Sequence, residues 1–111
     1  RIDVKAGVSA KCRIFESGEL DSIALLLSEA LGLEGTFCFQ VMHDADGRVV
    51  VTDVNARPGA GTSMCWTTGN DFHAANFARC WDEPYEQYFR PVQGSIFVTR
   101  QYADFLTGTA P

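Results

Sequence analysis

Four polar residues in a predicted hairpin have the chemistry and the spacing of a site for a metal ion and a phosphate. Asp53, Asn55 and Arg57 alternate with other residues in the stretch VVVTDVNAR, so they share one face if this stretch forms a strand. Pairing around Asp46-Gly47 would place Gln40, on the preceding strand, opposite Asp53. Carboxylate and amide oxygens are ligands that magnesium takes, and an arginine beside them would bind phosphate. The pattern predicts phosphoryl-transfer chemistry, with Gln40, Asp53 and Asn55 on the metal and Arg57 as the catalytic residue.

Each of these residues also has a plainer interpretation. Asp53 and Asn55 could belong to a solvated face of an edge strand, and Gln40 could be only a cross-strand hydrogen-bond partner. Arg57 could form a salt bridge within a loop. Arg100, near the end of the chain, could contact a substrate or simply flank the sheet.

The hairpin that holds these residues is the clearest structural prediction. Asp46-Gly47 suits the positive φ angles of a type I′ turn, and apolar residues alternate with polar ones on both sides of it. The face with the polar residues is expected to include Cys38, Met42, Val49 and Val51. The opposite face is predicted to pack on a helix, and it carries Phe37, Phe39, Val41, Val50, Thr52 and Val54.

The remaining elements follow from periodicity and capping residues. Apolar residues recur at helical spacing over residues 19–31, with Ser17 as N-cap and Gly32 as C-cap. A second helix is predicted over residues 71–81 with Asp71 as its cap. Short strands are expected at residues 2–4 and 12–15 and over 94–102, with a helical turn at 63–67. We therefore predict one α+β domain spanning residues 1–111, with a mixed or antiparallel sheet covered by helices.

The composition narrows the classes of partner and compartment. The net charge is −5 and only two lysines occur, which argues against nucleic acid as the main partner. No apolar run is long enough to cross a membrane. The four cysteines have no metal-ligand spacing, so they are expected to be free, mostly buried thiols in the cytoplasm. The chain begins at Arg1 without a signal peptide, and we expect it to be a piece of a larger protein.

The stretch GTFCFQVMHDADGRVVVTDVNARPGAGTSMCWTTGNDF resembles the C-terminal subdomain of ATP-grasp enzymes, in the branch that includes the carbamoyl-phosphate synthase large subunit and related carboxylate–amine ligases. In that family a Gln or Glu on one strand and the pattern E-x-N-x-R on the next hold two magnesium ions and the terminal phosphates of ATP. Gln40, Asp53, Asn55 and Arg57 occupy these positions, with Asp53 where Glu is commoner. The stretch KAGVS resembles the loop after the strand that faces the nucleotide, which would place Lys5 near phosphate.

The resemblance implies ATP and Mg²⁺ (or Mn²⁺) as cofactors and a small carboxylate as substrate. ATP phosphorylates the carboxylate in this family, and an amine or other nucleophile attacks the acyl phosphate. Residues 59–63 are then expected to form a substrate loop, because their glycines let backbone N–H groups approach an anion.

The resemblance also implies that the chain is the C-terminal half of an ATP-grasp fold, without the phosphate lysines and Gly-rich loop of the N-terminal half. The isolated chain is therefore expected to be inactive as a ligase. The alternative is a non-catalytic binding or dimerisation module that keeps the fold and could form a homodimer.

Overall fold

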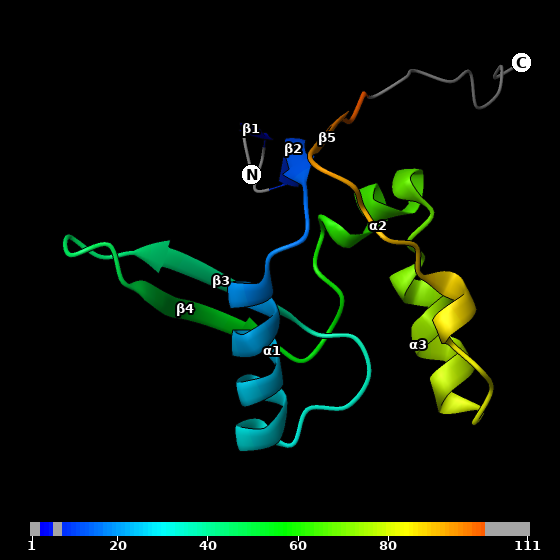
Figure 1. Ribbon diagram of the computed structural model, residues 1–111. Helices are drawn as coiled ribbons and strands as arrows, with labels where there is room; N and C mark the ends of the chain where they lie inside the picture. The colour runs from blue at the N-terminus through cyan, green and yellow to red at the C-terminus, as the bar shows by residue number, and fades with distance from the viewer. Residues whose placement is uncertain (1–2, 6–7, 102–111) are drawn as a thin grey trace, which may run out of the picture.

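The protein is an α+β chain in which the described residues form two small antiparallel sheets and three α-helices (Figure 1). The computed structural model describes residues 3–5 and 8–101, and side chains from Ala10 to Gln101. None of the helices in this part of the chain is long and apolar enough to cross a membrane. The elements are, in chain order, β1 (Asp3–Lys5), β2 (Val8–Ile14), α1 (Gly18–Leu31), β3 (Cys38–His43), β4 (Val49–Asn55), α2 (Thr62–Cys65), the 3₁₀ helix η1 (Trp66–Thr68), α3 (Phe72–Cys80), the 3₁₀ helix η2 (Glu86–Tyr88) and β5 (Ile96–Thr99).

Helices α1 and α3 begin where their capping residues predict. The Ser17 hydroxyl accepts a hydrogen bond from Leu20 N–H at 3.4 Å, and Gly32 ends α1 with a left-handed φ of 60°. The Asp71 carboxylate accepts from two N–H groups at the start of α3, those of His73 and Ala74. The predicted helix bounds are confirmed to within a few residues because short-range capping determines them.

The three-stranded sheet has the order β1-β2-β5 and is antiparallel throughout. Strand β2 begins at Val8, so the strand expected at residues 12–15 starts four residues earlier. Strand β5 occupies only the middle of the segment expected at 94–102, whose last residue lies outside the described part. The antiparallel alternative of the prediction is confirmed, but the strands form two separate sheets rather than one.

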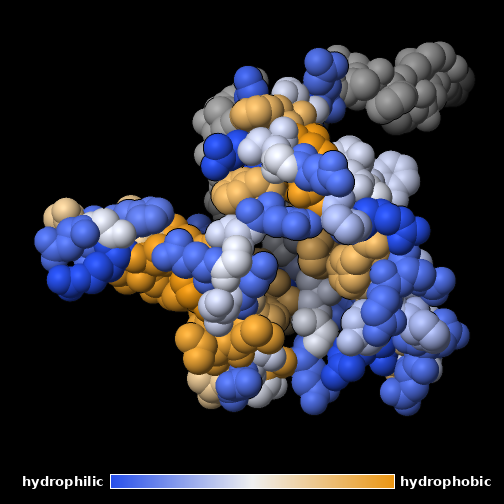
Figure 2. Space-filling view, viewed as in Figure 1, coloured by the Kyte–Doolittle hydropathy of each residue, from blue (hydrophilic) through white to orange (hydrophobic). Residues whose placement is uncertain are grey.

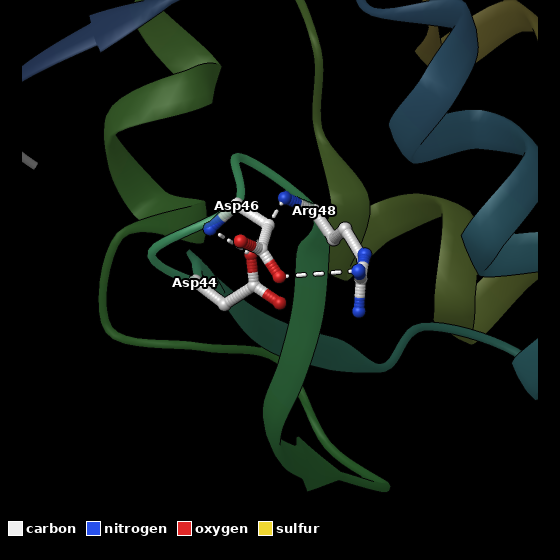
Figure 3. A network of polar contacts seen from close by, with 3 residues as sticks. All are labelled: Asp44, Asp46 and Arg48. Atoms are coloured by element: carbon white, nitrogen blue, oxygen red, sulfur yellow. Dashed lines mark hydrogen bonds and ion pairs between the residues drawn. The ribbon is translucent and has the colours of Figure 1, made fainter.

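The β3–β4 hairpin forms, but its turn differs from the prediction. A type I′ turn needs positive φ at both Asp46 and Gly47, and of these only Gly47 has it, at 80°. The Asp44 carboxylate accepts hydrogen bonds from the N–H groups of Asp46 and Arg48 at 2.9 and 2.8 Å (Figure 3). These bonds, with an ion pair of 3.1 Å between Arg48 and Asp46, stabilise a longer loop, in which His43 and Val49 are the last paired residues.

A β-bulge at Thr52 then changes which residues share a face. Between the turn and the bulge, Met42 pairs with Val50. Beyond the bulge, Gln40 pairs with Asp53 and Cys38 pairs with Asn55. Thr52 is the extra residue, and its hydroxyl donates to the carbonyl of Gln40 at 3.3 Å. The pairing of Gln40 with Asp53 is confirmed, but the assignment of valines to faces near the turn is wrong. Val50 shares the face of Met42, so Val49 and Val51 do not.

Helix α1 covers the apolar face of the hairpin only in part. Of that face, Phe37, Phe39, Val41 and Val54 are half-buried, whereas Val50 and Thr52 are exposed. No residue of α1 is buried, and Leu25, Leu26 and Leu31 are 56 to 66% exposed. Figure 2 shows apolar surface over the hairpin and α1, and the tip of the hairpin projects from the rest of the molecule (Figure 1). The hydrophobic residues that are buried within the described chain are Ala10, Met64, Ala75 and Ala78.

The described part of the chain consequently leaves much apolar surface exposed. A cavity of about 780 Å³ lies between α1, α3 and the segment that joins α1 to β3, with Phe37, Phe39, Phe72 and Phe89 in its walls.

Gly35 and Gly47 give a test of how the α1–β3 segment is held on α3. Both have positive φ, but a Cβ on Gly35 would lie 2.5 Å from Asn76 Oδ1, whereas nothing lies within 4 Å of one on Gly47. That Asn76 oxygen accepts from Thr36 N–H at 2.9 Å. Gly47→Ala should lower the free energy of unfolding by about 1–2 kcal/mol, because alanine strains the backbone at a positive φ. Gly35→Ala should lower it by about 1–3 kcal/mol more, because this hydrogen bond is also lost. Urea denaturation of both variants measures the difference, and equal costs would contradict the contact.

Candidate functional site

Three of the residues predicted from the sequence meet at the base of the β3–β4 hairpin. Gln40 Nε2 donates to Asp53 Oδ2 at 3.1 Å, and Asn55 Nδ2 donates to the same oxygen at 2.5 Å. Gln40 and Asp53 are exposed and Asn55 is half-buried. The bulge at Thr52 makes this meeting possible because it keeps Gln40 opposite Asp53. The predicted metal-ligand set is therefore a contiguous cluster.

The cluster also fits the plainer interpretation of Gln40 as a cross-strand partner, since a hydrogen bond joins it to Asp53. The two interpretations differ in which amide atoms face the carboxylate. The O and N atoms of an amide are assigned from their hydrogen bonds, and rotation of each amide would turn its oxygen toward a cation that Asp53 holds. The same three side chains can serve as hydrogen-bond partners or as oxygen ligands.

The number of charges in the cluster limits the kind of metal site. It contains one carboxylate, and no group of three His, Cys, Asp or Glu side chains arranged to hold a metal ion occurs among residues that the structure describes. One carboxylate with two amides cannot form an all-protein cage. The set suits Mg²⁺, which commonly takes one or two carboxylates and completes its shell with water and substrate phosphates.

Arg57 lies beside the cluster but not on the same strand face as predicted. Strand β4 ends at Asn55, and a 2.7 Å hydrogen bond from Arg57 N–H to the carbonyl of Asn55 closes a three-residue turn. The guanidinium is exposed and donates from Nη1 to the carbonyl of Pro58 at 3.1 Å. No ion pair joins it to a carboxylate in the described residues, so the predicted alternative of a loop salt bridge is not observed.

Lys5 is the last residue of β1, where it pairs with Val8 in the three-stranded sheet. Its side chain lies outside the described residues. Its expected position near phosphate stays a prediction.

The loop of residues 59–63 is held against both sheets. A Cβ on Gly59 would lie 3.1 Å from Cys38 Sγ, so the loop backbone passes close to the start of β3. Arg100 Nη2 donates to Ser63 Oγ at 2.8 Å and to the carbonyl of Ala60 at 3.2 Å. The sequence identifies Arg100 as a candidate, but no pattern in it indicates these partners, which lie 37 and 40 residues away.

A sulfur contact fixes the short helix that follows this loop. Cys12 Sγ on β2 lies 3.7 Å from Met64 Sδ on α2, and Met64 is buried. Burial and the neighbouring Cys12 thiol raise the pKa of Cys65. The four cysteines are free as predicted, but Cys12, Cys38 and Cys65 are only half-buried and Cys80 is exposed, so the expected burial is wrong.

Comparisons with protein-family models, curated proteins and solved structures found no match to this chain.

The environment of Cys65 predicts its reactivity. Because the raised pKa lowers its thiolate fraction and the thiolate is the nucleophile, iodoacetamide should alkylate Cys65 more slowly than exposed Cys80 at pH 8. The rate at Cys65 should continue to rise at pH values above the usual range for a thiol. Mass spectrometry of peptides at several times and pH values measures both rates. Equal rates for the two cysteines would show that α2 does not pack on β2 as described.

Proposed function

We propose that this chain is the ATP- and magnesium-binding half of an ATP-grasp ligase, which activates a carboxylate as an acyl phosphate for attack by an amine or other nucleophile. The observation that carries the proposal is the convergence of Gln40 and Asn55 on one oxygen of Asp53. These are the side chains at which the resemblance places the metal ligands. The proposal extends to Arg57 as the phosphate ligand and to Lys5 as a further nucleotide contact.

The cluster supports a site for a metal ion that arrives with a nucleotide. Asp53 Oδ2 accepts both amides, and its Oδ1 has no hydrogen bond among the described residues, so one carboxylate oxygen is available. Asp53 would hold Mg²⁺, with the amide oxygens of Gln40 and Asn55 turned toward it. The ion would supply neutralisation of the charge that develops as the terminal phosphate moves to the substrate.

Arg57 would act on the same phosphate from the end of β4. Its guanidinium uses one N–H on the Pro58 carbonyl and keeps further donors for a phosphate oxygen. A planar fork binds two oxygens of one phosphate, and this geometry stabilises negative charge in the transition state. Asn55 and Arg57 lie on either side of a tight turn. Their closeness in the chain supports the idea that the metal ion and the guanidinium act together on the phosphate.

The exposed apolar surface of the described chain supports the idea that further polypeptide completes the site. Exposed leucines on α1 and an apolar hairpin face are surfaces that a folded enzyme covers. We therefore expect the chain alone to bind metal and nucleotide weakly and to catalyse no ligation. The free thiols are consistent with a reducing compartment, and we propose a cytoplasmic location.

A second candidate function is a binding or dimerisation module without turnover, which the outer face of α3 favours. Phe77 and Trp81 are 60 and 71% exposed and stack on each other, with ring centroids 5.9 Å apart. Beside them lies a hollow of about 370 Å³ in which Ala74, Ala78 and Tyr88 also take part. Exposed aromatic residues beside small ones are typical of interface centres.

The metal assignment is tested by paramagnetic broadening in the NMR spectrum of the chain with Mn²⁺ and ATP. The amide signals of Gln40, Asp53 and Asn55 should broaden selectively. Asp53→Asn should weaken this selective broadening about tenfold or more, because the substitution removes the only charged ligand. Asp46→Asn is the matched control, since Asp46 is an exposed carboxylate on the same hairpin, paired with Arg48. Unchanged broadening in Asp53→Asn would refute the proposed site.

The dimerisation alternative is tested by sedimentation equilibrium up to about 100 μM, where micromolar dimers are detected. If α3 forms an interface, the wild-type chain should dimerise and Trp81→Ala should be monomeric. Trp66→Ala is the control, because Trp66 is equally exposed, at 68%, but lies in η1. A wild-type chain that stays monomeric throughout would exclude this alternative.

A further inference from the structure

The hollow on the outer face of α3 combines aromatic rings with a carboxylate. Its volume is about 370 Å³, and the residues that form it are Ala74, Phe77, Ala78, Trp81, Glu83 and Tyr88. The first four have the spacing i, i+3, i+4 and i+7, so they share one face of the helix and its C-terminal turn. Because the two alanines carry only a methyl group, the longer side chains project beyond them and enclose the hollow.

The turn after α3 brings Glu83 back to the helix. The N–H of Glu83 donates to the carbonyl of Ala78 at 2.9 Å, and the N–H of Asp82 donates to the carbonyl of Arg79 at 3.2 Å. This is the hydrogen-bond pattern of a Schellman motif, whose left-handed residue is usually glycine. Asp82 takes that position here, with a φ of 55°, and no other non-glycine residue in the described chain has a positive φ. The turn places Glu83 in the wall of the hollow.

The remaining wall of the hollow comes from Tyr88 in η2. After the turn the chain runs back beside α3 (Figure 1), and the Tyr88 carbonyl accepts a hydrogen bond of 3.0 Å from the N–H of Asp71, the cap of that helix. Phe77 and Trp81 stack on each other in the same hollow. Three aromatic rings therefore line one small space whose backbone is held at both ends of α3.

The charge around the hollow is negative. Residues 81–89, WDEPYEQYF, contain three carboxylates and no Lys or Arg. Glu83 is exposed, and no ion pair among the described residues engages its carboxylate. Arg79 does not line the hollow and pairs with Glu34 at 3.6 Å. The carbonyl groups at the C-terminus of α3 add partial negative charge, so the hollow favours a cation.

The walls select the kind of cation. Each ring carries negative charge over its face, and a weakly hydrated cation gains most from it because little hydration is lost. A primary ammonium needs acceptors for three N–H groups, whereas Glu83 and Tyr88 are the polar side chains among the six residues of the hollow. A quaternary ammonium group has no N–H and needs none. The volume suits a small ligand, since small-molecule pockets measure about 300–1,000 Å³.

A second copy of the chain fits this hollow less well than a cation does. A symmetric dimer brings the same patch of both copies together, so the acidic residues beside Trp81 would face their own copies. Like charges across an interface repel, and no basic residue lines the hollow to offset them. A bound cation would instead neutralise Glu83.

We propose that the hollow on α3 binds the quaternary ammonium group of a small molecule. Phe77, Trp81 and Tyr88 surround the cation, and Glu83 supplies the opposite charge. None of these residues belongs to the proposed metal site on the hairpin, so the proposal does not rest on the ligase function.

The test is an NMR titration of the ¹⁵N-labelled chain with choline at constant ionic strength. Choline should shift the indole N–H signal of Trp81 and leave that of Trp66 unchanged, because Trp66 is equally exposed but lies in η1. A second titration uses the neutral isostere of choline, the alcohol in which a carbon atom replaces the nitrogen. It should bind at least about tenfold more weakly, because it has the same shape but no charge to interact with the rings and Glu83.

Substitutions separate the aromatic and the charged contributions. Trp81→Leu should weaken choline binding about tenfold, measured at the Tyr88 amide, whereas Trp81→Phe should weaken it only about two- to threefold because a ring remains. Glu83→Gln should weaken it about three- to fivefold, since it keeps the shape and removes the charge. Glu86→Gln is the matched control, because Glu86 is an exposed acid of the same segment that does not line the hollow. Thermal melting of each variant shows whether the chain remains folded.

Four results would overturn the proposal. Equal affinity for choline and its isostere would show a merely apolar hollow, and equal shifts at Trp66 and Trp81 would show nonspecific contact with exposed rings. Unchanged choline affinity in Trp81→Leu would place the ligand elsewhere. A trimethyllysine peptide that binds more than about tenfold more tightly than choline would refute the assignment to a small molecule. Mn²⁺ broadening at Asp53 tests the metal site separately, so failure of one proposal is distinguishable from failure of the other.

Discussion

The candidate site depends on an extra residue in β4 that compensates for the long hairpin turn. The turn around Asp44 pairs His43 with Val49, and a regular ladder continued from there would pair Gln40 with Thr52. Asp53 would then point to the other face, because side chains alternate along a strand. The bulge at Thr52 restores the pairing of Gln40 with Asp53. A one-residue difference in the ladder therefore decides whether the two amides and the carboxylate meet.

A second constraint is the small amount of apolar surface that the chain buries. Bulges and open hairpins are tolerated where neighbouring structure holds them, yet α1 leaves Leu25 and Leu26 largely exposed beside the hairpin. The cleft between α1 and α3 leaves the four phenylalanines in its walls only half-buried. The same property supports both proposed functions, because an enzyme half and a dimerisation module each need a covering partner. Their difference lies in which face is covered.

The loop after β4 shows how distant segments organise the space around the cluster. Gly59 packs on β3, Arg100 binds the loop from the end of β5, and Cys12 on β2 touches Met64 on the helix that follows. Each contact joins segments far apart in the chain. Together they bring the two sheets to one loop, although no strand pairing among the described residues connects the sheets. The position of the loop is thus a property of the whole described chain.

The sequence by itself determined the local elements and the composition of the site. Ser17, Gly32 and Asp71 marked helix ends because caps act over a few residues, and the alternation around Asp53 and Asn55 predicted a polar strand face. The sequence also predicted the pairing of Gln40 with Asp53, but from a two-residue turn that does not form. The pairing is nevertheless correct, because the longer loop shifts the strand register by one residue and the bulge shifts it back. Only the tertiary structure decided the bulge at Thr52, the separation into two sheets, the exposure of α1 and the partners of Arg100. These features depend on contacts between distant residues, and neither periodicity nor capping carries information about them.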